Sequence, residues 1–253
     1  MNTTSECLAD TAGNHPTASS QAPAPTRRTV DAPTRTFHWL LALSFTGAYA
    51  TAESESLRLL HTTLGYTMAG LIVARVVWGL IGPRPARLSS WGARLRPLWT
   101  LRPSNLLSRI TSLRPSLNML AVVGILLMAT GGVLSGIAMD QEWFNAAFME
   151  DVLEELHEFA GNGTLMLVIT HLGLLVMGFK RQGTTQVMSM VSGRMPGKGP
   201  DLVHHNRVWL SALILMCVLA FWAWQWQTRP APTDHPITHA THAQHGHHTD
   251  DDD

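Results

Sequence analysis

The sequence contains few cysteines and few charged residues. Only Cys7 and Cys217 occur in 253 residues, and charged residues make up 14% of the chain. Because one cysteine lies in a polar N-terminal segment and the other in an apolar run, neither an internal disulfide nor a thiolate metal cluster is expected. No repeat of about 33 to 47 residues is visible, so we expect no repeat architecture.

The two ends of the chain lack apolar runs. Residues 1–34 are rich in Ser, Thr, Ala and Pro, and residues 229–253 are rich in His, Thr and Asp. Neither segment can bury enough apolar area to offset the loss of chain entropy, so we expect both to be disordered.

The middle of the chain is expected to be an all-α integral membrane helical bundle. A hydrocarbon core about 30 Å thick needs about 20 apolar residues in a helix. Five segments reach or nearly reach this length: 36–52, 60–81, 116–139, 153–179 and 208–226. Soluble helices are rarely this long and this apolar on all sides. We predict a four-helix core over 35–207 and a fifth C-terminal transmembrane helix over 208–228.

The charges between the apolar segments predict the orientation in the membrane. The connection at 82–115 has seven arginines and no acid, and the connection at 180–207 has five basic residues and one acid. The connection at 140–152 has four acids and no base. Basic connections face the cytoplasm, so we expect a multi-pass protein of the bacterial inner membrane with a cytoplasmic N-terminus and a periplasmic C-terminus.

A cleaved secretory signal is the alternative interpretation of the first apolar segment. Ala48-Tyr49-Ala50 and Ala50-Thr51-Ala52 resemble cleavage sites that follow an apolar region. The polar segment in front is long for a signal peptide, and His38 interrupts the apolar region. A retained membrane helix is therefore favoured.

Four histidines lie in or at the apolar segments, at two depths. The direction in which each segment crosses puts His61 and His157 toward the outer side and His38 and His171 toward the inner side. His157 and His171 are fourteen residues apart. That spacing is about 21 Å along a helix and nearly four whole turns, so the two side chains share one face. One helix can thus contribute an imidazole to each of two stacked sites.

These histidines are candidate axial ligands of haem iron. Two facing imidazoles with no thiolate or carboxylate pair suit haem better than zinc, because haem supplies four nitrogens and needs two axial ligands. Depth pairs His61 with His157 and His38 with His171. The alternative is that the four histidines form polar contacts between helices.

Two glycines and two arginines are further candidates at these sites. Gly65 and Gly161 each follow a candidate ligand by four residues, on the face where a flat macrocycle needs room. Glycine is also common in membrane helices because it allows close packing. Arg75 lies at inner depth and is a candidate partner of a haem propionate, as is Arg35. Alternatively, the guanidinium of Arg75 reaches the cytoplasmic headgroups.

These stretches resemble the bacterial cytochrome b561 family, which includes the membrane cytochrome b subunits of nickel–iron hydrogenases. The matching stretches lie within about 35–195 and are Arg35-Thr-Phe-His38-Trp39, Leu60-His61-Thr-Thr-Leu-Gly65-Tyr66, Arg75-Val-Val-Trp-Gly-Leu-Ile-Gly82-Pro83-Arg84, and Leu156-His157-Glu158 with the later His171. The resemblance implies a bundle with two b-type haems and places their axial ligands at the same four histidines. A fifth helix and a His-rich tail depart from the usual four-helix bundle.

The leading functional hypothesis is transmembrane electron transfer, by a carrier or by the cytochrome b subunit of an oxidoreductase. Iron with two histidine ligands has no open coordination position, which favours electron transfer over oxygen chemistry. The resemblance implies exchange between the quinone pool and a periplasmic cytochrome c or oxidoreductase subunit. The acidic segment 140–155 is a candidate docking surface for a basic partner, or it only reflects the topology. We expect no nucleic-acid partner, and the sequence leaves a homodimer open.

The second hypothesis is a membrane protein that handles copper, zinc or nickel. Imidazole-rich tracts bind these metals. The tail histidines are His235, His239, His242, His245, His247 and His248. However, a disordered tail can bind metal without transport, and the apolar segments lack the carboxylates of an ion path. A haem-free scaffold subunit is a third alternative.

Overall fold

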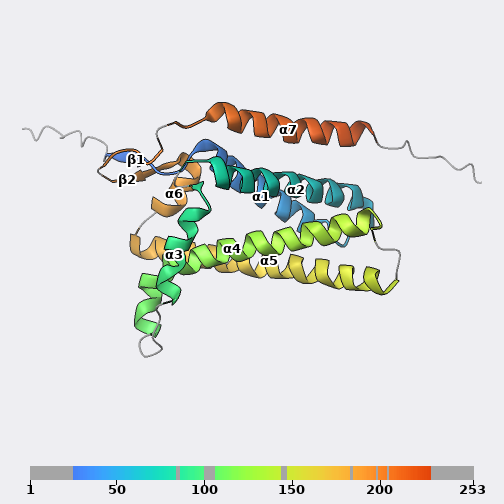
Figure 1. The fold of residues 1–253 in the computed structure, drawn as a ribbon, viewed down its shortest axis with the longest axis horizontal. Helices are drawn as coiled ribbons and strands as arrows, with labels where there is room; N and C mark the ends of the chain where they lie inside the picture. Colours follow the sequence, from blue (N-terminus) through green and yellow to red (C-terminus); the bar gives the residue numbers. More distant parts are fainter. Residues whose placement is uncertain are drawn as a thin grey trace, which may run out of the picture.

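Five long helices and several short elements make up the computed structural model. The structure describes residues 25–83, 86–99, 106–143, 147–182, 185–197, 199–203 and 205–228. The long helices are α1 (Ala32–Ala50), α2 (Arg58–Ile81), α4 (Leu106–Asp140), α5 (Ala147–Gln182) and α7 (Val208–Gln227). The short elements are the strands β1 (Thr26–Arg28) and β2 (Arg194–Pro196), the 3-10 turn η1 (Glu55–Leu57), and the helices α3 (Ser89–Trp99) and α6 (Thr185–Ser192). The long helices run side by side, and β1, β2, α3 and α6 gather at one end of them (Figure 1).

Helix boundaries follow from local sequence signals. Asp31 precedes α1 as its N-cap, and Pro33 stands in the first turn, where its missing N–H costs no hydrogen bond. At the other end of α1, the Thr51 N–H donates to Gly47 O at 3.1 Å. Helix α2 ends at Ile81, directly before Gly82 and Pro83, and this proline cannot continue the hydrogen-bond ladder.

Four helical stretches of the described residues are long and apolar enough to cross a membrane. They are Glu55–Ile81, Leu113–Asp140, Phe148–Gly178 and Val208–Gln227. Helix α1 does not reach the same apolar character, because Arg, His, Thr and Ser interrupt its 19 residues. The structure therefore fits a membrane helical bundle. That α1 also crosses, and that the bundle divides into a four-helix core plus a fifth crossing, stay predictions.

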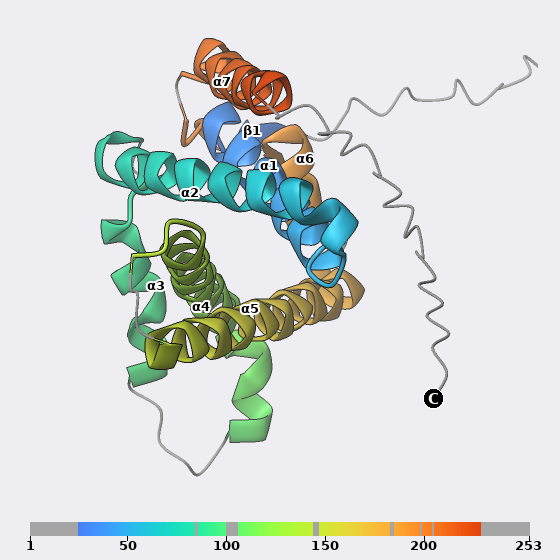
Figure 2. The same ribbon diagram turned by 90° about the vertical axis from the view of Figure 1, so that its right-hand side faces the viewer.

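The helices pack as two hairpins with α7 outside them. Helices α1 and α2 form one pair and α4 and α5 the other (Figure 2). Small residues let α4 and α5 approach closely: a Cβ at Gly132 would lie 3.4 Å from Ala160 Cβ. Helix α7 packs on α1 and α2, where Trp222 Nε1 donates to Thr67 Oγ1 at 2.9 Å. No residue of α7 is buried, as expected of a helix that faces lipid.

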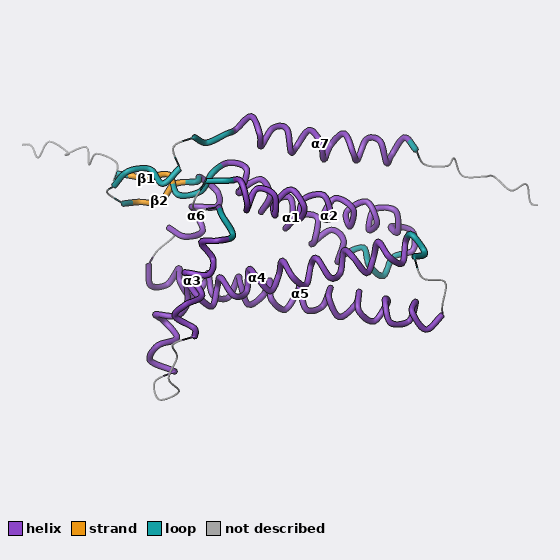
Figure 3. The backbone as a smooth tube through the Cα atoms, viewed as in Figure 1, coloured by secondary structure: helices purple, strands orange, loops and turns teal. Residues whose placement is uncertain are grey.

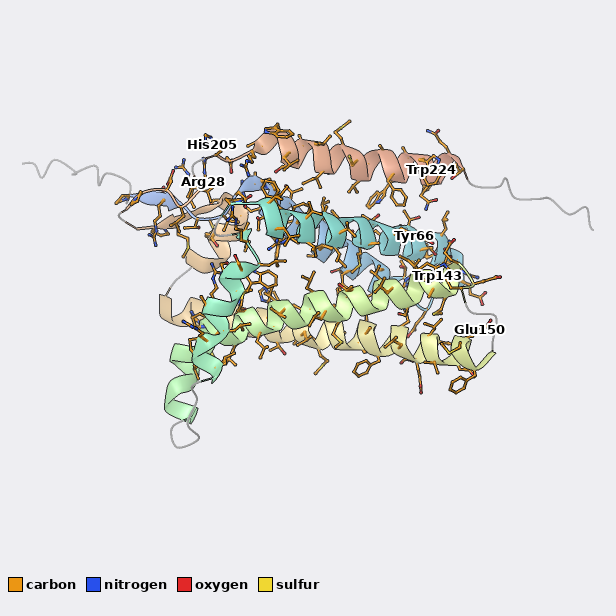
Figure 4. The ribbon with its side chains drawn as sticks, viewed as in Figure 1. Arg28, Tyr66, Trp143, Glu150, His205 and Trp224 are labelled. Carbon is orange, nitrogen blue, oxygen red and sulfur yellow. The ribbon has the colours of Figure 1, made fainter. Side chains whose placement is uncertain are left out.

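The two ends of the bundle carry opposite charge. We call the end with β1, β2, α3 and α6 the basic end, and the end where α1 joins α2 the acidic end. Figure 4 shows Arg28 at the basic end and Glu150 at the acidic end. The side of the membrane that each end faces stays a prediction.

The predicted disordered leader does not extend to residue 34. Strand β1 pairs antiparallel with β2, with Thr26 opposite Pro196, and the Arg28 N–H donates to Asp201 Oδ1 at 2.7 Å. These partners lie about 170 residues further along the chain, so composition around residues 25–34 alone did not reveal them. In Figure 3 the two short strands stand apart from the helices in colour. Residues 1–24, and the predicted tail at 229–253 with its histidines, lie outside the described residues.

Candidate functional site

His61 of α2 and His157 of α5 face each other near the acidic end. Their ring centroids are 6.0 Å apart and their planes are inclined at 66°. The Nδ1 of His61 lies 2.8 Å from Ala48 O, and the Nδ1 of His157 lies 2.8 Å from Gly132 O. A carbonyl oxygen only accepts, so each Nδ1 carries the proton and donates it. Both Nε2 atoms are then left with a free lone pair.

This arrangement suits two axial ligands of one metal. An imidazole nitrogen binds a metal at about 2 Å, so two rings on opposite sides of one ion have centroids about 6 Å apart. A ligating histidine usually donates its other N–H to a carboxylate, a backbone carbonyl or water. Among the described residues there is no group of three or more His, Cys, Asp or Glu that could hold an ion. The donor set thus fits a group that brings its own equatorial donors.

The faces of α2 and α5 next to this pair leave space. A Cβ added at Gly65 or at Gly161 would meet no atom within 4 Å. Both glycines follow a candidate ligand by one helical turn, so the open positions lie beside the imidazoles. A flat macrocycle between the two hairpins needs room at these positions, and the residues present therefore fit haem.

His38 of α1 and His171 of α5 are the second candidate pair, toward the basic end. Both Nδ1 atoms are buried and have no hydrogen-bond partner among the described residues. These two histidines thus lack the carbonyl partners of the first pair, and their pairing, expected from depth, stays a prediction.

The two candidate arginines engage segments at the basic end. Arg75 Nη1 lies 3.5 Å from Ala86 O, and its guanidinium lies 5.6 Å from the ring centroid of Trp91. Arg35 Nη1 donates to Val191 O at 2.8 Å. Both side chains therefore have protein partners, and a role of either toward a haem propionate stays a prediction.

Several residues around these sites were not predicted from the sequence. Asp31 is only 2% exposed and accepts from Trp78 Nε1 at 2.9 Å, while the Arg207 guanidinium lies 5.2 Å from the Trp78 ring. An aspartate directly before Ala-Pro is a helix N-cap signal that could have identified Asp31. Gly136 was also not predicted to lie at the site. A Cβ at this position would lie 2.9 Å from His157 Cε1.

The family comparison agrees with this geometry. The model of a family described as prokaryotic cytochrome b561 matches residues 29–193, more than half of the 253-residue chain. The match includes α1, α2, α4 and α5 with all four histidines. No curated protein and no solved structure matched the chain. The resemblance predicted from the sequence is confirmed: the chain belongs to the prokaryotic cytochrome b561 family, and so is a multi-pass bacterial membrane cytochrome of b type.

Proposed function

We propose that this protein transfers electrons across the bacterial inner membrane through two haem b sites. His61 and His157 would hold the haem of the outer site, and His38 and His171 the haem of the inner site. The observation that carries the proposal is the His61–His157 pair, with ring centroids 6.0 Å apart and each Nδ1 on a backbone carbonyl. Haem supplies a one-electron redox centre when it is bound.

Backbone carbonyls would hold the outer histidines in place, and two histidine ligands at each iron would exclude oxygen chemistry. The Ala48 and Gly132 carbonyls hold the Nδ1 protons, so that Nε2 of each outer histidine is the nitrogen that would bind the iron. Two protein ligands per site leave no coordination position for oxygen. Helix α5 supplies one ligand to each site, and fourteen residues separate them, which is about 21 Å of helix. The two sites together therefore cover most of the apolar thickness.

The charges at the two ends support a proposed orientation and a proposed kind of partner. The basic end would face the cytoplasm. At the acidic end, Glu150, Asp151, Glu154 and Glu155 are exposed along α5. These carboxylates would attract a basic periplasmic cytochrome c or oxidoreductase subunit. Quinone is the proposed partner within the membrane, and a homodimer is compatible with the exposed apolar faces.

The haem content of the purified protein tests this function. We expect a dithionite-reduced spectrum of b type and two haems per chain by pyridine haemochrome assay, because the proposal assigns a pair of histidines to each of two sites. A protein without haem would contradict the proposal. A haem-free protein that binds copper, zinc or nickel would instead favour the metal-handling hypothesis, whose tail histidines lie outside the described residues.

Gly136 offers a sharper test of the outer site. In Gly136→Ala the new Cβ would approach His157 Cε1 to 2.9 Å and Nδ1 to 3.2 Å, so the imidazole must shift. We expect the variant to lose much of its outer haem and to approach one haem per chain. The matched control is Gly131→Ala, whose Cβ would meet only Ala160 Cβ at 4.0 Å.

Both substitutions raise the helix propensity of α4 by about 1 kcal/mol, so a difference between them reports the contact with His157. Equal haem contents in the Gly136→Ala and Gly131→Ala proteins would show that the position of His157 does not depend on this glycine.

A further inference from the structure

We propose that α3 (Ser89–Trp99) is a membrane-surface helix whose exposed arginines, Arg94 and Arg96, bind the phosphate groups of anionic phospholipids at the basic end. This lipid site is separate from the histidine pairs and does not depend on haem. Three features carry it: the direction of α3, the turn that sets this direction, and the charge of the segment that contains the helix.

Helix α3 crosses the long helices steeply instead of running along them. Figure 1 and Figure 2 both show it lying across the basic end of the bundle. Helix α2 before it and α4 after it are both long and apolar enough to cross a membrane. A helix that lies across the ends of membrane-spanning helices follows the membrane surface, so α3 lies where the hydrocarbon core meets the headgroups.

The turn between α2 and α3 sets this direction. The Leu88 N–H donates to Gly79 O at 3.0 Å. A Cβ at Gly79 would lie 2.6 Å from Leu88 Cγ, so the absence of a side chain at Gly79 allows this close approach. Arg87 Nε donates to Gly82 O at 2.9 Å. The chain therefore folds back against the last turn of α2, and α3 begins beside the end of α2 instead of further out in solvent.

Trp91 anchors the first turn of α3 to the border of the apolar core. The Arg75 guanidinium of α2 lies 5.6 Å from the centroid of the Trp91 ring, within the range of a cation–π contact. Tryptophan is enriched at the interface between hydrocarbon and headgroups. Since Arg75 belongs to a membrane-spanning helix, this contact keeps α3 at the depth of the headgroups.

The side chains of α3 divide into an apolar stripe and two exposed cations. Trp91, Leu95 and Leu98 are half-buried, and their spacing places them on one face of the helix. Helix α3 packs on α4, so this stripe is its protein-facing side. Arg94 and Arg96 are exposed on either side of the stripe. A long arginine stem can follow apolar surface while its guanidinium stays in the polar layer.

The charge of this segment selects an anionic ligand. Residues 82–115 contain seven arginines and no acid. A guanidinium matches a phosphate with two parallel hydrogen bonds, and basic clusters next to membrane-spanning helices attract anionic lipids. A soluble acidic protein would also match the charge. Because α3 lies along the membrane surface, however, the phosphates of lipid headgroups are the nearest anions, and we assign the site to them.

Native mass spectrometry of the full-length protein in detergent, titrated with phosphatidylglycerol or phosphatidylcholine, tests the site. We expect tighter binding of phosphatidylglycerol, and a preference that falls as ammonium acetate is raised, because salt screens exposed charges. Arg94→Gln and Arg96→Gln should each weaken the binding of phosphatidylglycerol about fivefold. Both variants should bind phosphatidylcholine as the unmodified protein does.

Arg58→Gln is the matched control for the loss of one positive charge. Arg58 is also an exposed arginine, but it begins α2 at the acidic end, so its substitution should leave the binding of phosphatidylglycerol unchanged. Arg94→Lys keeps a cation and should retain most of the binding, which separates a charge effect from a packing effect. An equal loss in Arg58→Gln, or equal binding of the two lipids by the unmodified protein, would overturn the proposal.

Two competitors distinguish the lipid from other anions. Inorganic phosphate that displaces phosphatidylglycerol at equal concentration would assign the arginines to a free anion. Polyglutamate that binds in preference to phosphatidylglycerol, and loses this binding in Arg94→Gln, would assign them to a soluble acidic partner. Either result overturns the lipid site. The haem content of the purified protein should be the same in every variant, so the test stands whether or not the proposed electron transfer is correct.

Discussion

Replacing either His61 or His157 with alanine should remove the same haem from the purified protein and halve its haem content. The two rings face each other at 6.0 Å, so each variant deprives one metal position of one of its two axial ligands. The remaining imidazole alone holds the macrocycle less tightly. The glycines beside it, Gly65 and Gly161, have no side chains that could take over from the lost ligand. Pyridine haemochrome assay and the reduced-minus-oxidised spectrum measure this loss.

The inner pair should behave in the same way and independently. His38→Ala and His171→Ala should each remove the other haem and leave the spectrum of the outer one. His205→Ala is the control, because His205 is exposed at the basic end (Figure 4) and belongs to neither pair. If His61→Ala and His171→Ala lost the same haem, the pairing by depth would be wrong.

Adding imidazole to a His61 variant distinguishes loss of the haem ligand from disruption of the fold. His61→Gly leaves a space of the size of the ring beside the metal position and keeps the rest of α2 unchanged. Imidazole added during purification should restore the second haem if His61 acts only as a ligand. A protein that stays at one haem at any imidazole concentration would indicate that the ring is also needed to join α2 to Ala48 O.

Much of this architecture could be predicted because membrane insertion leaves strong sequence signals. Long apolar stretches identified 60–81, 116–139, 153–179 and 208–226, and each lies within a helix that is long and apolar enough to cross. The fourteen-residue spacing of His157 and His171 predicted their shared helix face, since a helix repeats every 3.6 residues.

The basic end was the least predictable part of the fold. Residues 82–115 were treated as a connection, but they contain α3 and the beginning of α4. Helix α3 is short and contains two arginines, so no apolar run in the sequence identified it. Arg75 packs on Trp91 of this helix, a contact that requires the fold to bring the two segments together.

The hydrogen bonds that hold the outer histidines could not be predicted either. Their acceptors are the backbone carbonyls of Ala48 and Gly132. Every residue has such a carbonyl, so the identity of the side chains at these positions does not indicate that their carbonyls accept from a histidine. The packing of Gly136 on His157 is hidden for a similar reason, because glycine is frequent in membrane helices for helix packing in general.

Gly65→Leu should remove the outer haem and leave the helix that bears it intact. A Cβ at Gly65 would meet no protein atom within 4 Å, so the first atom of the new side chain does not press on the protein. Leucine also raises helix propensity over glycine by about 0.8 kcal/mol. The loss would therefore come from a side chain that occupies the space of the macrocycle beside His61. We expect one haem per chain by pyridine haemochrome assay.

Gly70→Leu provides the matched control on the same helix. Its Cβ would also meet nothing within 4 Å, and Gly70 is exposed while Gly65 is half-buried. Five residues separate the two glycines, so their side chains point about 140° apart around α2. Gly70→Leu should keep both haems, because its side chain would extend into lipid. If Gly65→Leu kept both haems as well, the open space at Gly65 would also face lipid, and the outer haem would not lie over this face of α2.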